Sequence, residues 1–137
     1  MIRYSYLWHV EYLRGQEEGV KDRPCAVVLL VKNEDSGDVV TVLPITHTPP
    51  SNSEADLTIE IPTETKRRLG LDDERSWIIL SEANRFTWPG PDLRMARNGD
   101  TSSVVFGLLP DGLFERVRTT FLAALKASKV QPVPRTE

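Results

Sequence analysis

The sequence of 137 residues contains one cysteine and two histidines, and no apolar run is long enough to cross a membrane. Cys25 alone cannot form an intrachain disulfide, and the distant His9 and His47 lack the spacing of zinc ligands. Walker loops and Gly-rich dinucleotide turns are also missing, so we expect neither a metal nor a cofactor. The N-terminus has no apolar signal region, which predicts a cytoplasmic protein without membrane contact.

Basic residues are also outnumbered by acidic residues. The 17 Lys and Arg residues against 20 Asp and Glu residues give a formal net charge of −3, which excludes a polybasic protein. Any nucleic-acid site must therefore be a local patch. Hydrophobic residues make up 39% of the chain, enough for one core without disulfides. We predict a single domain over 1–128, followed by a flexible tail over 129–137 that contains two prolines.

Short apolar or alternating segments, separated by turn residues, predict a mainly β protein. Cys25 lies inside one such segment, which indicates a buried structural thiol. A short helix over 62–69 should end at Gly70, and an apolar stripe predicts a helix of roughly 16 residues from Asp111. Long irregular loops are expected over 47–56 and 85–99. The expected strands cover 5–13, 25–31, 39–46, 57–61, 77–80 and 104–106.

The closely spaced strands favour a small barrel or curled sheet capped by the C-terminal helix. Several motifs also follow one another in a characteristic order. They are a glycine-bounded loop leading to an Arg-Pro pair, an apolar strand, a Pro-x-Thr strand end, and an apolar strand ending in an acidic residue with arginine three positions on. Here these motifs are Gly15–Gly19 with Arg23 and Pro24, Cys25–Val31, Pro44–Thr46, and Trp77–Glu82 with Arg85.

This order and spacing resembles the MazF/PemK family of toxins from bacterial toxin–antitoxin systems, over roughly residues 6 to 127. The resemblance implies an SH3-like small barrel with added helices and a homodimer. It also implies metal-independent cleavage of single-stranded RNA, and neutralisation by an antitoxin protein. The family's catalytic residues would correspond to Arg23, Thr46 and Glu82.

The residue types at these positions suit that chemistry. The guanidinium of Arg23 can bind two phosphate oxygens, although a salt bridge to Asp22 or Glu17 is the alternative. The hydroxyl of Thr46 could form a hydrogen bond with a phosphate oxygen or with the 2′-hydroxyl. The alternative is an ordinary threonine at the end of a strand. The carboxylate of Glu82 could accept the 2′-hydroxyl proton or orient Arg23, or could be a solvated loop group.

A second set of residues is predicted to hold the RNA. Arginines and aromatic rings alternate in the segment 85–97, as in loops that bind single strands, although a core tryptophan with surface arginines is the alternative. His47, beside Thr46, could protonate the leaving oxygen. The runs 66–68 and 72–74 are expected to be solvated, without a metal. The candidate substrate-binding residues are Arg85, Phe86, Trp88, Arg94, Arg97 and His47.

The sequence departs from the family pattern at several places. Tyr6, Leu7 and Trp8 replace a Gly-Asp-Ile opening, Leu80 replaces a second arginine, and Gln16 replaces a loop histidine. These departures leave open a non-catalytic module on the same fold, which binds a partner or nucleic acid. A topoisomerase poison of the CcdB type is disfavoured, because the last five residues lack the apolar, tryptophan-containing end of that family.

Overall fold

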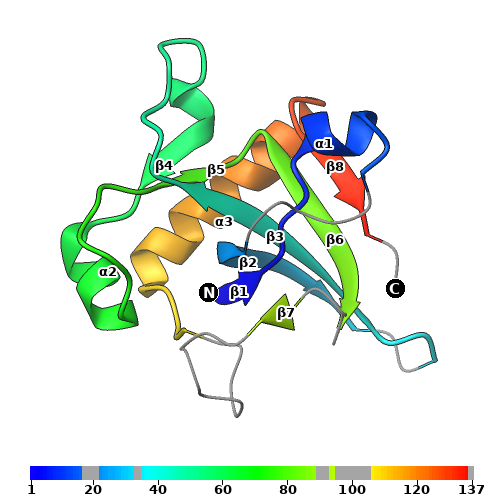
Figure 1. The fold of residues 1–137 in the computed structure, drawn as a ribbon, viewed down its shortest axis with the longest axis horizontal. Coiled ribbons are helices and arrows are strands. Elements are labelled where there is room, and N and C mark those ends of the chain that lie inside the picture. The colour runs from blue at the N-terminus through cyan, green and yellow to red at the C-terminus, as the bar shows by residue number, and fades with distance from the viewer. Residues whose placement is uncertain (17–21, 33–34, 89–92, 95–105, 136–137) are drawn as a thin grey trace.

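The computed structural model describes residues 1–16, 22–32, 35–88, 93–94 and 106–135. Its helices and strands are shown in Figure 1. The helices are α1 (His9–Leu13), α2 (Thr63–Leu69) and α3 (Asp111–Lys126), with a 3₁₀ turn η1 (Ala55–Leu57). The strands are β1 (Ile2–Tyr4), β2 (Arg23–Val31), β3 (Asp38–Thr46), β4 (Thr58–Glu60), β5 (Trp77–Ile79), β6 (Glu82–Trp88), β7 (Leu93–Arg94) and β8 (Gln131–Pro134). None of the described helices is long and apolar enough to span a membrane.

The expectation of a mainly β fold is confirmed, and β3 organises the sheet. One side of β3 pairs with β2, while the other side pairs first with β6 and then with β5. Pro44 lies between these two pairings, where its missing N–H interrupts neither ladder. All pairings are antiparallel except that of β6 with β8. In the described part of the chain the sheet is open, because its end strands β4 and β7 do not pair.

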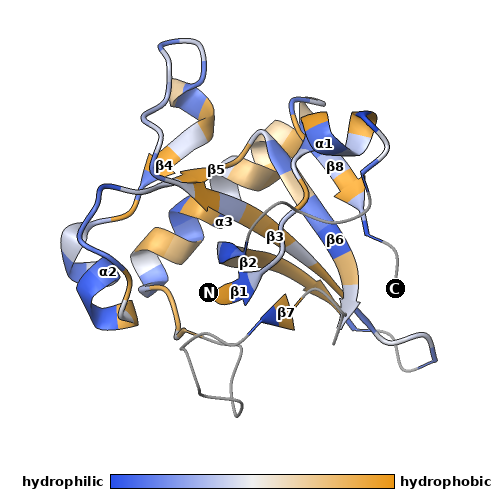
Figure 2. Ribbon diagram, in the orientation of Figure 1, coloured by the Kyte–Doolittle hydropathy of each residue, from blue (hydrophilic) through white to orange (hydrophobic). Residues whose placement is uncertain are grey.

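Apolar side chains form one core on each face of the sheet, as period-two alternation requires. Leu43 and Ile45 of β3 belong to the core covered by α3, whereas Val40 and Val42 belong to the core on the opposite face. Much of β3 has the hydrophobic colour in Figure 2, as expected of a strand with apolar side chains on both faces. Both faces are therefore buried around β3, which fixes the position of its last residue, Thr46.

Helix α3 spans Asp111–Lys126, as the apolar stripe predicted. Val117, Phe121 and Ala124 are buried, whereas Leu125 at the end of the predicted stripe is exposed. Cys25 is fully buried, and burial raises the pKa of its thiol well above the usual value. The prediction of an inert structural thiol is confirmed by this burial, because a nucleophilic cysteine needs a lowered pKa.

The predicted strand over 5–13 is wrong. The chain forms β1 earlier and then turns into α1, where the backbone N–H of Trp8 donates to Glu11 Oε1 at 3.0 Å. The buried side chain of Asn84 binds both the N–H and the carbonyl of Leu7, at 2.9 and 2.8 Å. A side chain thus replaces the ladder partner that a strand would need, which sequence periodicity cannot reveal.

The predicted tail and the later loop also need correction. Residues 131–134 form strand β8 beside β6, and Val133 is fully buried, so the tail is not frayed there. Residues 85–88 belong to β6 and 93–94 to β7 rather than to one irregular loop. Of the predicted strand 104–106, the first two residues lie outside the described part, and Phe106 is irregular.

Two glycines, Gly37 in the turn between β2 and β3 and Gly112 in α3, form a matched pair for a stability test. Gly37 has a φ of 89°, and a Cβ there would lie 2.7 Å from Thr87 Cγ2. A Cβ on Gly112 in α3 would meet nothing within 4 Å. We expect Gly37→Ala to lower the free energy of unfolding by about 1–2 kcal/mol, and Gly112→Ala to raise it by roughly 0.5–1 kcal/mol. Urea denaturation measures both, and a Gly37→Ala protein at least as stable as wild type would contradict the turn geometry.

Candidate functional site

Arg23 and Thr46, which the sequence places 23 positions apart, open onto one cleft. Arg23 begins β2 and Thr46 ends the neighbouring β3, so antiparallel pairing brings them to the same end of the sheet. The cleft has a volume of about 490 Å³, which is within the usual range for small-ligand sites. Its lining residues are Trp8, Asp22, Arg23, Pro24, Ile45, Thr46, His47, Thr48, Lys66, Leu71, Asp72 and Ser76.

The guanidinium of Arg23 is held in place on two sides. Its Nη1 donates to the carbonyl of Ile45 at 3.1 Å, and its central carbon lies 4.7 Å from the ring centroid of Trp8. This stacking is a cation–π contact, which orients the plane of the guanidinium. Burial lowers the pKa of Arg23, but a guanidinium starts so high that it stays charged at neutral pH. The cleft therefore contains an oriented positive charge.

No carboxylate among the described residues forms an ion pair with Arg23. Asp22, its neighbour in sequence, instead binds Arg94, with 3.3 Å between Oδ1 and Nε. The alternative in which Arg23 pairs with Asp22 is therefore wrong, and Glu17 lies outside the described residues. Arg23 is half-buried, and its Nε is enclosed without a hydrogen-bond partner among the described residues, so a donor and a positive charge are available to a ligand in the cleft. This favours an anionic ligand at Arg23.

Thr46 and His47 form the wall of the cleft where β3 ends. Thr46 Oγ1 accepts a hydrogen bond from the N–H of Thr48 at 3.1 Å, which leaves its own hydroxyl proton available to a ligand. His47 Nε2 lies 2.8 Å from Asp72 Oδ2, and its Nδ1 lies 3.0 Å from Glu74 Oε2. Both ring nitrogens thus face carboxylates in the loop after α2, which fixes the ring at the mouth of the cleft.

Lys66 is the site residue that the sequence analysis missed. It was assigned to a solvated run with Arg67 and Arg68, and only those two are exposed. Lys66 is 4% exposed, and its Nζ donates to Asp72 Oδ1 at 2.5 Å and to the carbonyl of Glu74. A signal was present, because Lys66 lies three positions before the buried Leu69 and hence on the inner face of α2.

Asp72 connects Lys66 to His47. Burial tends to raise the pKa of its carboxyl, but the hydrogen bond and charge of Lys66 outweigh that effect, and the pKa is lowered overall. The backbone N–H of Glu74 also donates to Asp72 Oδ1, at 3.1 Å. The loop 72–74, expected to be solvated, is exposed, yet Asp72 binds Lys66 and both Asp72 and Glu74 contact His47.

Glu82, the third predicted catalytic residue, is not among the residues that line the cleft. Its Oε1 accepts hydrogen bonds from the Tyr6 hydroxyl at 3.1 Å and from the N–H of His9 at 3.0 Å. Burial raises the pKa of Glu82, and burial together with the Glu82 charge raises that of Tyr6. The structure therefore places Glu82 under α1, where it positions the N-terminal segment.

This placement predicts that Glu82→Gln leaves RNA cleavage close to the wild-type rate, because the amide oxygen can still accept both hydrogen bonds. The raised folded-state pKa means that ionisation disfavours the folded protein. Wild type should thus lose stability relative to Glu82→Gln as the pH rises from about 4 to 7. Thermal denaturation across that range checks the sign. A large loss of cleavage in a folded Glu82→Gln would restore a catalytic role for Glu82.

The predicted substrate-binding residues do not form one loop. Phe86 is buried and stacks on Tyr4 at 4.7 Å between centroids, so it is a core residue and not a platform for bases. Trp88 is partly buried against the same core, and Arg85 is exposed on β6. Arg94 forms an ion pair with Asp22, and Asp22 lines the cleft. Arg97 lies outside the described residues.

No family model matches the sequence, and searches of curated proteins and of solved structures found no significant match. The groups that line the cleft therefore indicate the class of ligand. Within the described residues, the cleft combines an oriented guanidinium, a hydroxyl with a free proton, and a fixed imidazole. That set of donors suits a phosphate ester better than an apolar ligand or a cationic one.

Proposed function

We propose that this chain is a metal-independent endoribonuclease that cleaves single-stranded RNA in the cleft between Arg23 and Thr46. The observation that carries the proposal is the oriented charge of Arg23 in that cleft. Arg23 is oriented by Ile45 and Trp8, has no carboxylate partner among the described residues, and lines the same cleft as Thr46. A phosphodiester supplies the negative charge and the acceptor oxygens that these groups lack.

RNA carries its own nucleophile, so the protein need not provide one. The 2′-oxygen attacks the adjacent phosphorus, a bond from phosphorus to the 2′-oxygen forms, and the bond to the 5′-oxygen breaks. Arg23 and Thr46 donate to the phosphate oxygens and stabilise the charge of the transition state. His47 protonates the leaving 5′-oxygen once one of its ring nitrogens is released from its carboxylate partner, and a carboxylate of the cleft wall, Asp22 or Asp72, accepts the 2′-proton.

The proposal extends to the fold and the biological role. Along one side, β3 pairs first with β6 and then with β5. We take this change of partner as a bend in the sheet, and the bend supports an open form of the SH3-like barrel. The MazF/PemK resemblance then assigns the chain as the toxin of a toxin–antitoxin system. Its proposed partners are single-stranded RNA, an antitoxin protein and a second copy of the chain, in the cytoplasm.

A non-catalytic binding module is the second candidate, and the position of Glu82 favours it. The acidic residue of the family pattern lies outside the cleft and is bound to Tyr6 and His9, so one predicted catalytic group is missing there. A cleft of this kind could bind RNA through Arg23 without turning it over.

The test uses purified protein and a long single-stranded RNA in excess EDTA. We expect discrete fragments whose 5′-side products end in a 2′,3′-cyclic phosphate. Once a cleavage site is mapped, an oligonucleotide with a single 2′-deoxy substitution at that site should remain intact. Binding of intact RNA without cleavage would identify the binding module instead. Cleavage of this oligonucleotide at the 2′-deoxy position would exclude the proposed chemistry, because no 2′-oxygen is present there to attack.

A further inference from the structure

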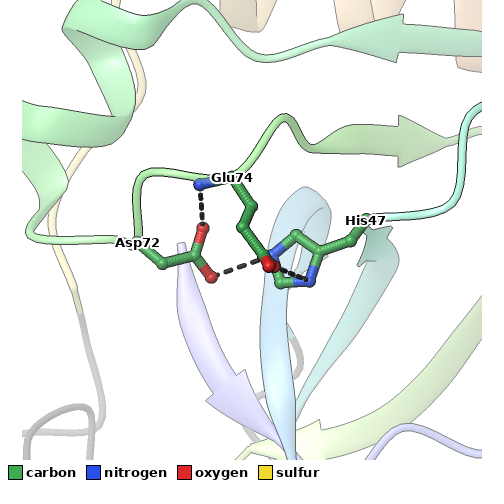
Figure 3. A group of neighbouring side chains, drawn as sticks. All are labelled: His47, Asp72 and Glu74. Carbon is green, nitrogen blue, oxygen red and sulfur yellow. Dashed lines mark hydrogen bonds and ion pairs between the residues drawn. The ribbon is translucent and has the colours of Figure 1, made fainter.

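Three side chains with metal-ligating groups meet at the mouth of the cleft, and their positions suggest a second binding function. His47 follows β3, while Asp72 and Glu74 lie in the loop after α2 (Figure 3). One ligand atom from each residue lies within 4.8 Å of the others. We propose that these residues, the His47 cluster, bind a first-row divalent transition-metal ion of the Zn²⁺ type. This inference does not depend on the proposed ribonuclease function.

The spacing of the ligand atoms suits such an ion. Bonds of about 2.1 Å to nitrogen and oxygen place the ligand atoms of a tetrahedral site roughly 3.4 Å apart. The present ligand atoms lie within 4.8 Å of one another, and all three residues are exposed, so their side chains are free to close to that spacing. The Nε2–Oδ2 contact of 2.8 Å places Asp72 at the nitrogen that would bind the ion, and Glu74, now 3.0 Å from Nδ1, must rotate its exposed side chain toward the same nitrogen.

The chemistry of the three groups selects the class of ion. An imidazole nitrogen with two carboxylates suits Zn²⁺, Mn²⁺ or Co²⁺, whereas Mg²⁺ prefers all-oxygen sites that keep several waters. The two carboxylates balance the charge of a divalent ion. Three protein ligands leave a coordination position open to solvent and to the cleft, which is the pattern of an open site and not of a structural zinc centre.

The surroundings of Asp72 provide a separate argument. Its Oδ1 is held by the buried ammonium of Lys66 and by the N–H of Glu74, so its Oδ2 remains directed at His47. Groups that orient a ligating carboxylate in this way raise the precision of a metal site. The charge of Lys66 opposes the ion, so binding should be weaker than in closed zinc sites. Sequence spacing could not reveal this cluster, because His47 and Asp72 are 25 positions apart.

Isothermal titration of the EDTA-treated and dialysed full chain with ZnCl₂ tests the proposal. We expect saturable binding at one site, and binding at least about tenfold weaker in His47→Ala and in Glu74→Gln. Asp73→Asn removes a neighbouring acid outside the cluster, and His9→Ala removes the other histidine of the chain, so both should bind as wild type does. MgCl₂ should give no comparable heat.

Absorption spectroscopy with Co²⁺ provides a readout that a loss of stability does not imitate. Visible bands of protein-bound Co²⁺ should appear with wild type and Asp73→Asn, and disappear with His47→Ala, while all three keep the same circular dichroism spectrum. Absence of saturable Zn²⁺ binding, or equal binding by His47→Ala, overturns the proposal. Binding that is lost in His9→Ala places the ion elsewhere and overturns it as well. RNA cleavage is assayed in EDTA, so failure of either proposal is recognised independently of the other.

Discussion

Replacing Arg23 with alanine is expected to slow RNA cleavage by about a hundredfold to a thousandfold, the usual loss when a preorganised donor to a transition-state anion is removed. Arg23 is the cation of the cleft that no described carboxylate neutralises, and Ile45 and Trp8 hold it in a fixed orientation. Its contribution should therefore appear in the chemical step. Single-turnover cleavage of a fluorescent oligonucleotide that contains a mapped site, in EDTA, measures the rate directly.

Two further variants separate charge, geometry and folding. Arg68→Ala removes the same charge from the exposed side of α2 and should cleave like wild type. Arg23→Lys keeps the charge but loses the planar, two-point donor, so it should remain slow. Because Arg23 also binds the Ile45 carbonyl, thermal denaturation must show that the variants are folded. A folded Arg23→Ala protein that cleaves at the wild-type rate would remove this cleft from the mechanism.

The elements that the sequence predicted well are those whose signal is local. Alternation or continuous apolar character marked β2, β3, β4 and β5, and a long stripe marked α3. The end of α2 followed from Gly70, which adopts a left-handed φ of 72°. In each case neighbouring residues carry the information, because the side chains that define the element are a few positions apart.

The errors occur where distant residues decide the structure. The aromatic segment 5–13 resembles a strand, but Asn84, which lies 77 positions from Leu7, takes over its backbone hydrogen bonds. Similarly, Arg85–Trp88 belongs to β6 because β3 provides a ladder partner there, although the Pro-Gly-Pro sequence that follows is typical of a loop. A partner far away in sequence overrides local propensity in both cases.

The residues of the candidate site also fall into those that the sequence predicted correctly and those that depend on distant partners. Arg23 and Thr46 were found because a family pattern specified them, and the structure brings both to one cleft. Lys66 was missed because a lysine beside two arginines looks like a solvated surface, and only the fold shows it buried under Asp72. Glu82 matched the pattern, yet α1 lies over it and takes its carboxylate. A motif thus identifies residue types but not the partners that decide their roles.

The C-terminal strand is where the sequence prediction and the structure lead to opposite experimental outcomes. In β8, Val133 is fully buried whereas Gln131 is exposed, although the two are only two positions apart on one short strand. We expect Val133→Asp to lower the free energy of unfolding by at least about 2 kcal/mol, from lost apolar burial and from the cost of burying a carboxylate. Gln131→Asp should change it little. Urea denaturation of both variants measures the difference.

Detachment of β8 sets the upper limit on that cost, because the strand can leave the sheet before it buries a charge. Detachment is itself unfavourable. It breaks the bonds from Arg135 Nη1 to the Ser5 carbonyl at 2.7 Å and to Asn84 Oδ1 at 3.0 Å, and it exposes an edge of β6. Asn84 is the side chain that holds the segment before α1, so the loss should spread to the N-terminus. A flexible tail would make both substitutions neutral, and that result would contradict the packing of β8.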